Sequence, residues 1–173
     1  RIGDSGELAQ GFLPPGHPSY NAELPAIPFD PEEAKALLSQ SSYQKDGLPN
    51  LIYSAQGVTR PSVIVSRLIE MWRTDLGANV EVQLADPDLY FYVLDLLDDN
   101  LFTYGWVADY LDPHNFLDVL FHSKSENNVG GYKNDKLDKL LEAARSEQIP
   151  SVRSRLYREA EILIVEDAAA IPL

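Results

Sequence analysis

The sequence contains no cysteine, and this absence excludes disulfide bonds, thiolate nucleophiles and cysteine-based zinc sites. It also has no apolar run near the roughly 18 residues that a membrane-spanning helix requires. Basic residues are scarce, 14 against 27 acidic ones, so the formal net charge is −13. Such a field repels phosphate backbones and anionic membrane surfaces, and we therefore expect no nucleic-acid partner.

Motifs that mark most catalytic sites are also missing. The serines stand in no G-x-S-x-G context, no H-E-x-x-H stretch occurs, and no glycine-rich loop carries a phosphate-binding lysine. His114 and His122 have Asp118 between them at helical spacing, which would allow a metal site. Two exposed histidines on a surface helix explain the same spacing, and we favour that interpretation. We expect neither a metal nor a cofactor.

The chain begins with Arg1, without an initiator methionine or a signal sequence, and we interpret it as a piece of a longer protein. Its 173 residues, 45% of them hydrophobic, suffice for one domain with a core. Residues 1–30 hold five prolines, which oppose regular structure. We expect an irregular segment there that packs on the domain through its apolar residues, which are Phe12, Leu13, Tyr20 and Phe29.

Asp-Pro pairs at 30–31, 86–87 and 112–113 each place a capping carboxylate before a proline at the start of a helix. Apolar spacing then predicts helices over about 31–41, 62–76, 87–97, 114–121, 135–145 and 150–165. In the first of these, we expect Ala34, Leu37 and Leu38 to face inward. Short apolar or alternating runs predict strands near 49–55, 79–85, 101–108 and 169–173.

This order of strands and helices indicates an α/β domain with crossover connections. In such sheets ligands bind beyond the carboxyl ends of the strands. Trp106 and Asp109 stand at that position in "YGWVADYLDPHNF" and would offer an apolar wall and one charge, which suits an organic cation such as a peptide ammonium group. Asp109 and Asp112 together would also suit a carboxylate-dependent hydrolase, although we interpret Asp112 as a helix cap.

The stretch "GWVADYLDPHNFLDVLF" is similar to the G-W-x-A-D-Y-x-D-P-x-x-F-L signature of the oligopeptide and dipeptide receptors of bacterial ABC importers, the solute-binding proteins of family 5. Four further stretches agree in order and spacing, so that the resemblance covers nearly the whole chain. They are "GFLPPGHPSY", "FDPEEAKALLSQSSY", "SRLIEMWRTDLGANVEVQL" and "RLYREAEILIVEDAAAIPL".

This resemblance implies a type II periplasmic-binding-protein fold, in which two lobes trap a ligand between them. Residues 1–173 would form a single α/β lobe, the second one, with a small sheet flanked by helices, and the other lobe would lie outside this chain. The resemblance implies a secreted or lipid-anchored receptor, periplasmic or at the cell surface, that is monomeric, is not an enzyme and delivers peptides to an ABC permease.

The residues that match the family's ligand-binding motif are consecutive. Asp109 falls on the acid that pairs with the α-ammonium group of a bound peptide, and Trp106 falls on the aromatic beside it. Val107 and Ala108 fall where backbone groups pair with an extended peptide. The same family includes receptors for sugars and metal chelates, and these remain the alternative cargo.

Overall fold

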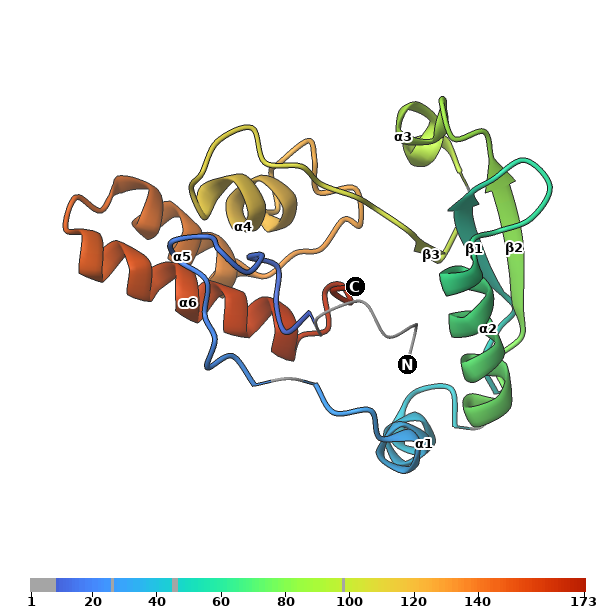
Figure 1. Ribbon diagram of the computed structural model, residues 1–173. Helices are drawn as coiled ribbons and strands as arrows, with labels where there is room; N and C mark the ends of the chain where they lie inside the picture. Colours follow the sequence, from blue (N-terminus) through green and yellow to red (C-terminus); the bar gives the residue numbers. More distant parts are fainter. Residues whose placement is uncertain (1–8, 26, 45–46, 98) are drawn as a thin grey trace. The chain divides into compact units, whose positions relative to one another are not determined.

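The computed structural model describes residues 9–25, 27–44, 47–97 and 99–173 (Figure 1). The chain divides into two compact units. The first consists of Pro28–Gly105, and the second combines residues up to Ile27 with Trp106–Leu173. No helix within the described ranges has the length and apolar character needed to cross a membrane.

The first unit is built on a small parallel sheet. Its strands lie in the order β2-β1-β3, and they span Leu51–Gln56 (β1), Val80–Ala85 (β2) and Leu101–Phe102 (β3). The helices α1 (Pro31–Gln40) and α2 (Val63–Leu76) belong to the same unit (Figure 1). The α/β class with a small sheet flanked by helices is thus confirmed. Its core consists of Tyr53, Ala55, Val65, Ile69, Ala78 and Val80.

Both helices begin and end at the residues that local chemistry favours. The Asp30 carboxylate accepts hydrogen bonds from the first backbone N–H groups of α1, as predicted. Ser62 caps α2 in the same way, and Gly77 ends it in the left-handed conformation with φ of 66°. The inward orientation predicted for Leu37 is wrong, because its side chain is 59% exposed.

The helix predicted over 87–97 is confirmed only in part. The structure has only the four-residue helix α3 (Tyr90–Val93) followed by a single 3-10 turn, η1 (Leu94–Leu96). The Asp86 carboxylate accepts from the N–H of Asp88 within a turn and caps no helix. Tyr90 is fully buried, and its hydroxyl donates to the Ser54 carbonyl on β1 at 2.9 Å. The segment folds around this one aromatic ring rather than along a helical row of leucines.

Two strand predictions also fail in part or in full. β3 ends at Phe102, so the rest of the predicted strand over 101–108 has no regular structure. Residues 169–173 form no strand. After α6 (Pro150–Glu166) the chain turns back at Ala168, whose φ is 49°, and the N–H of Ala169 returns to the Ile164 carbonyl at 3.1 Å. A strand needs a paired neighbour, and in the described residues this terminal stretch has none.

The second unit is helical. It contains α4 (His114–Phe121), α5 (Asp135–Ser146) and α6, and the side chain of Asn134 caps the start of α5. Residues 9–25 and Ile27 have neither helix nor strand. Leu13 nevertheless lies in the core of this unit, and the ring of Phe12 packs edge-on against that of Phe121 at 4.7 Å. The shared core includes Leu117, Leu137, Leu141, Tyr157, Ala160 and Ile164.

Candidate ligand-binding site

The predicted binding residues form an irregular segment just before α4. Val107 is 88% exposed and Asp109 is exposed, whereas Trp106 and Ala108 are half-buried. The Asp109 carboxylate makes no ion pair with another side chain of the described ranges. The segment therefore presents the Asp109 carboxylate to the solvent.

One buried side chain that the sequence reasoning missed holds this segment at both ends. Asn115 is 1% exposed, and its Oδ1 accepts a hydrogen bond from the indole Nε1–H of Trp106 at 2.9 Å. The same oxygen accepts from the backbone N–H of Asp109 at 3.2 Å. The indole ring and the backbone of residue 109 are therefore fixed to one point on α4.

The carboxylate of Asp112, the predicted helix cap, does more than bond to the start of α4. The N-cap residue of α4 is Pro113, and Asp112 lies one position before it. The two carboxylate oxygens of Asp112 accept from the Arg153 guanidinium at 2.8 and 2.9 Å, and one also accepts from the His114 N–H. Burial opposes the charge, but these hydrogen bonds outweigh it and lower the pKa of Asp112. Both oxygens are engaged, which disfavours an acid–base pair with Asp109.

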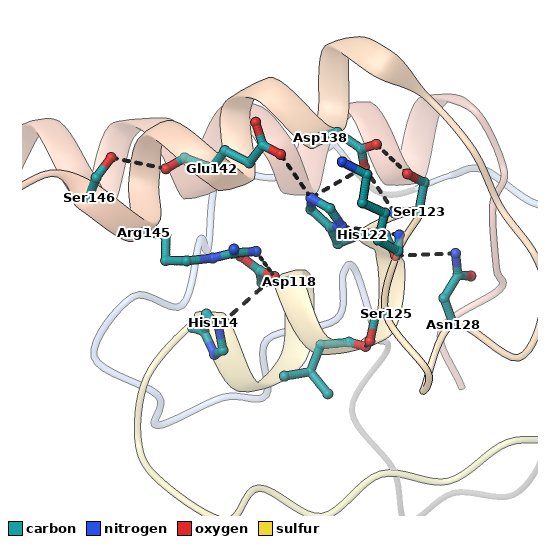
Figure 2. Close-up of polar contacts among 12 residues, drawn as sticks. His114, Asp118, His122, Ser123, Ser125, Asn128, Asp138, Glu142, Arg145 and Ser146 are labelled. Carbon is teal, nitrogen blue, oxygen red and sulfur yellow. Dashed lines mark hydrogen bonds and ion pairs between the residues drawn. The ribbon is translucent and has the colours of Figure 1, made fainter.

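The expectation of exposed histidines on α4 is wrong. His122 is only 5% exposed, and the side chain of His114 is 29% exposed. Figure 2 shows His114 and Arg145 directed at Asp118, which is itself buried and accepts from the Arg145 guanidinium at 2.7 Å. The charge of Asp118 is compensated by an arginine of α5, so this contact joins two helices.

His122 also joins α4 to α5. Its Nδ1 accepts from the N–H of Lys124, which leaves Nε2 to face Glu142 Oε1 at 3.4 Å (Figure 2). The hydroxyl of Ser123 donates to Asp138 and not to His122, so these residues do not form a nucleophile–base relay. No group of three metal-ligating side chains occurs in the described part of the chain. The cluster is consistent with a structural role.

Comparisons with known proteins show the family to which the chain belongs. Residues 2–128 match the model of the bacterial extracellular solute-binding proteins, family 5 Middle. The periplasmic oligopeptide-binding protein OppA of Salmonella typhimurium is 30% identical over 147 residues, which are 82% of this chain and 26% of that protein. The probable deoxycholate-binding periplasmic protein YgiS of Escherichia coli is 33% identical over 142 residues, 81% of this chain and 26% of that protein.

Among solved structures, the periplasmic binding protein DppA of Helicobacter pylori, in complex with the peptide STSA, aligns with a TM-score of 0.82 and 25% identity. The match covers 94% of this chain and 32% of that one. The fold is therefore that of the type II periplasmic binding proteins. The chain belongs to family 5 of the bacterial extracellular solute-binding proteins. It spans about a quarter to a third of the length of these relatives.

Proposed function

We propose that this chain is the ligand-binding lobe of a receptor that binds oligopeptides or dipeptides outside the cytoplasm and delivers them to an ABC importer. Both compact units would belong to this one lobe, and the other lobe would come from the remainder of a longer protein. The relatives named for peptide binding and the peptide-bound structural neighbour support this cargo. The receptor is proposed to be a monomer that is periplasmic or held at the cell surface by a lipid.

The observation that carries the proposal is the exposed and unpaired carboxylate of Asp109, held beside an oriented indole. The carboxylate would pair with the α-ammonium group of the peptide, and Trp106 would pack against its first residue. The backbone groups of Val107 and Ala108 would bond to the extended peptide, as when a strand is added to a sheet edge. Asp109 and the backbone groups of this segment would recognise the α-ammonium group and the backbone, which all peptides share, and they would not select among peptide side chains.

A second cargo has a specific observation in its favour. YgiS, named for deoxycholate binding, is 33% identical to this chain, against 30% for the OppA relative. An amphipathic anion would place an acid of the ligand near Asp109, and like charges would repel each other. We therefore favour a ligand with an amine over such an anion, and a sugar or metal chelate would likewise make no use of the Asp109 charge.

Capture from a peptide mixture tests the function. The full-length protein would be incubated with a library of two- to five-residue peptides, washed and denatured, and the released molecules would be identified by mass spectrometry. Release of peptides is the expected result. If the protein as purified released oligosaccharide, metal chelate or bile acid and no peptides, the peptide assignment would be wrong.

The Asp109 contact is tested by removing its charge from either side. In a closed, water-excluding cleft, loss of one partner of a buried charge pair costs about 2–5 kcal/mol. Asp109→Asn should therefore weaken binding of a free-amine peptide by about 30-fold or more, since about 1.4 kcal/mol corresponds to tenfold. Acetylation of the peptide amine should weaken binding to the wild type by a similar factor, as measured by calorimetry.

Asp109→Asn and acetylation of the peptide amine, when combined, should lower the binding free energy by less than the sum of their separate effects. Such non-additivity is the signature of direct coupling between the two groups. The control is Asp135→Asn, which removes an exposed carboxylate from the same unit at a distance along the chain and should leave affinity unchanged. Equal binding of free and acetylated peptides by the wild type would remove Asp109 from the site but leave peptide binding itself intact.

A further inference from the structure

The two ends of the segment 106–109 share a single acceptor atom. Trp106 donates through its side chain and Asp109 through its backbone, and both hydrogen bonds end on Oδ1 of Asn115. An amide carbonyl oxygen has two lone pairs and so accommodates two donors. This oxygen therefore sets the separation between the aromatic and the acid of the proposed site.

The acceptor is held in turn by the core of the second unit. The backbone N–H of Asn115 donates to the Asp112 carbonyl at 3.0 Å, and the Asp112 carboxylate is clamped by Arg153 of α6. Two residues further along α4, Leu117 is fully buried in the core. The Asn115 side chain, at 1% exposure, has little room to adopt another rotamer.

We propose that Asn115 is a positioning residue of the ligand site. Its carboxamide oxygen orients the Trp106 indole and fixes the backbone at Asp109, so that ring and carboxylate face a peptide amine together, while Asn115 itself remains covered. The effect of Asn115 on peptide binding rests on the proposed function. The positioning of residues 106–109 by Asn115 does not depend on any ligand.

The positioning is tested without any ligand, on the full-length protein labelled with ¹⁵N-tryptophan. The indole resonance of Trp106, assigned through Trp106→Phe, should shift in Asn115→Ala because its hydrogen bond is lost, while that of Trp72 should stay in place. Hydrogen exchange in residues 107–111 should become at least about tenfold faster, because the Asp109 N–H loses its acceptor.

Asn128→Ala is the matched control. Asn128 also joins two backbone groups through its carboxamide, since it accepts from the N–H of Tyr132 and donates to the carbonyl of the same residue. Its loss should lower the melting temperature without moving the Trp106 resonance. Asn115→Asp keeps an acceptor oxygen at the second position of a helix, where a negative charge is favoured, and should restore both readouts.

Binding is then measured with the peptide Ser-Thr-Ser-Ala. Asn115→Ala should weaken it by about tenfold, a loss of about 1.4 kcal/mol, and Asn115→Asp and Asn128→Ala should stay within about threefold of the wild type. An unmoved Trp106 resonance with unchanged exchange in Asn115→Ala would overturn the proposal, as would full binding by that variant. If the wild type binds no peptide at all, the proposed function fails, and the resonance and exchange data alone decide the positioning role.

Should Asn115→Ala not fold, Trp106→Phe provides the second route. It removes one of the two donors to Asn115 Oδ1 without altering α4, and it should accelerate exchange in residues 107–111 because the hydrogen bond from the indole to Asn115 is gone. Wild-type exchange rates in that variant would contradict the shared-acceptor arrangement.

Discussion

Glu161 is a carboxyl group placed almost wholly inside the second unit, with 1% of its surface exposed. Its Oε1 accepts from the N–H groups of Phe12 and Leu13 at 2.8 and 3.0 Å, whereas its buried Oε2 has no hydrogen-bond partner among the described residues. Gly11 makes this approach possible, because a Cβ atom there would lie 2.5 Å from Oε1. Burial raises the pKa of Glu161, and the two backbone hydrogen bonds only partly oppose that rise.

This raised pKa predicts a pH dependence of stability. Because the pKa of Glu161 is higher in the folded than in the unfolded chain, its contribution is fully present below the unfolded value and is lost as the pH rises through the folded value. Glu161→Gln keeps an acceptor at Oε1 and cannot ionise. Urea denaturation should therefore show the variant gaining stability relative to the wild type as the pH rises above about 4, the ordinary pKa of a glutamate.

Glu159→Gln, which alters an exposed carboxyl on the same helix, is the control for this comparison. A pH-independent difference between Glu161→Gln and the wild type would mean that Glu161 is accommodated as a charge. The same gain in Glu159→Gln would mean that the net charge of α6, and not burial, governs the effect.

The sequence predicted Trp106 and Asp109 through a family motif, but it did not indicate Asn115. A signal was present in the density of apolar residues along "HNFLDVLF", where five of the eight are large and apolar. Such a helix is covered on most of its circumference, so its polar residues are buried as well and need partners. Asn115 and Asp118 follow this rule, and the apolar spacing of the helix does not indicate which residues outside α4 are their partners.

Among the elements, α3 shows how one tertiary contact replaces a local pattern. Tyr90 is the first residue of this helix, and it is buried while its neighbours Phe91 and Tyr92 remain exposed. The hydroxyl of Tyr90 reaches the central strand β1. The segment is thus attached to the sheet through one side chain.

Substitutions within α3 should separate this contact from helix formation. Tyr90→Phe deletes only the hydrogen bond to Ser54 and should cost about 0.5–1.5 kcal/mol of unfolding free energy. Tyr90→Ala empties the ring's site and should cost about 3–5 kcal/mol. Tyr92→Ala, at a position 82% exposed in the same helix, should change stability by at most about 0.5 kcal/mol in urea denaturation. Equal losses for Tyr90→Ala and Tyr92→Ala would contradict the attachment through Tyr90.

The elements that could be predicted are those whose ends carry their own chemistry. Asp30, Ser62 and Asn134 cap three helices through their side chains, and Gly77 ends one of them. Between residues 86 and 108, the secondary structure depends on the burial of Tyr90 and on pairing with β1, and both are contacts with residues distant in the sequence. In segments of four residues or fewer, such long-range contacts outweigh the local helix or strand preference that the sequence pattern shows.

On the scale of the whole molecule, the chain matches about a third of the length of its structural relative. If the full-length receptor has two lobes, as proposed, this has a measurable consequence for binding. Closed ligand sites bury about 70–90% of a ligand's surface, which one lobe cannot achieve from one side. Residues 1–173 alone should therefore bind Ser-Thr-Ser-Ala far more weakly than the full-length protein does. Calorimetry that shows micromolar or tighter binding by this chain alone would contradict the two-lobe proposal.

The hydrogen bonds from Phe12 and Leu13 to Glu161 join residues 149 and 148 positions apart, and this separation bears on the order of events during synthesis. At about 5–20 residues per second, a ribosome needs about 7–30 s to reach Glu161 after Phe12 has been made. During that interval residues 28–105 of the first unit are synthesised. The N–H groups of Phe12 and Leu13 meanwhile lack their acceptor on α6. Protease cleavage within residues 9–27 of stalled nascent chains should persist until α6 has left the ribosome, and until then the apolar side chains of that stretch are available to chaperones.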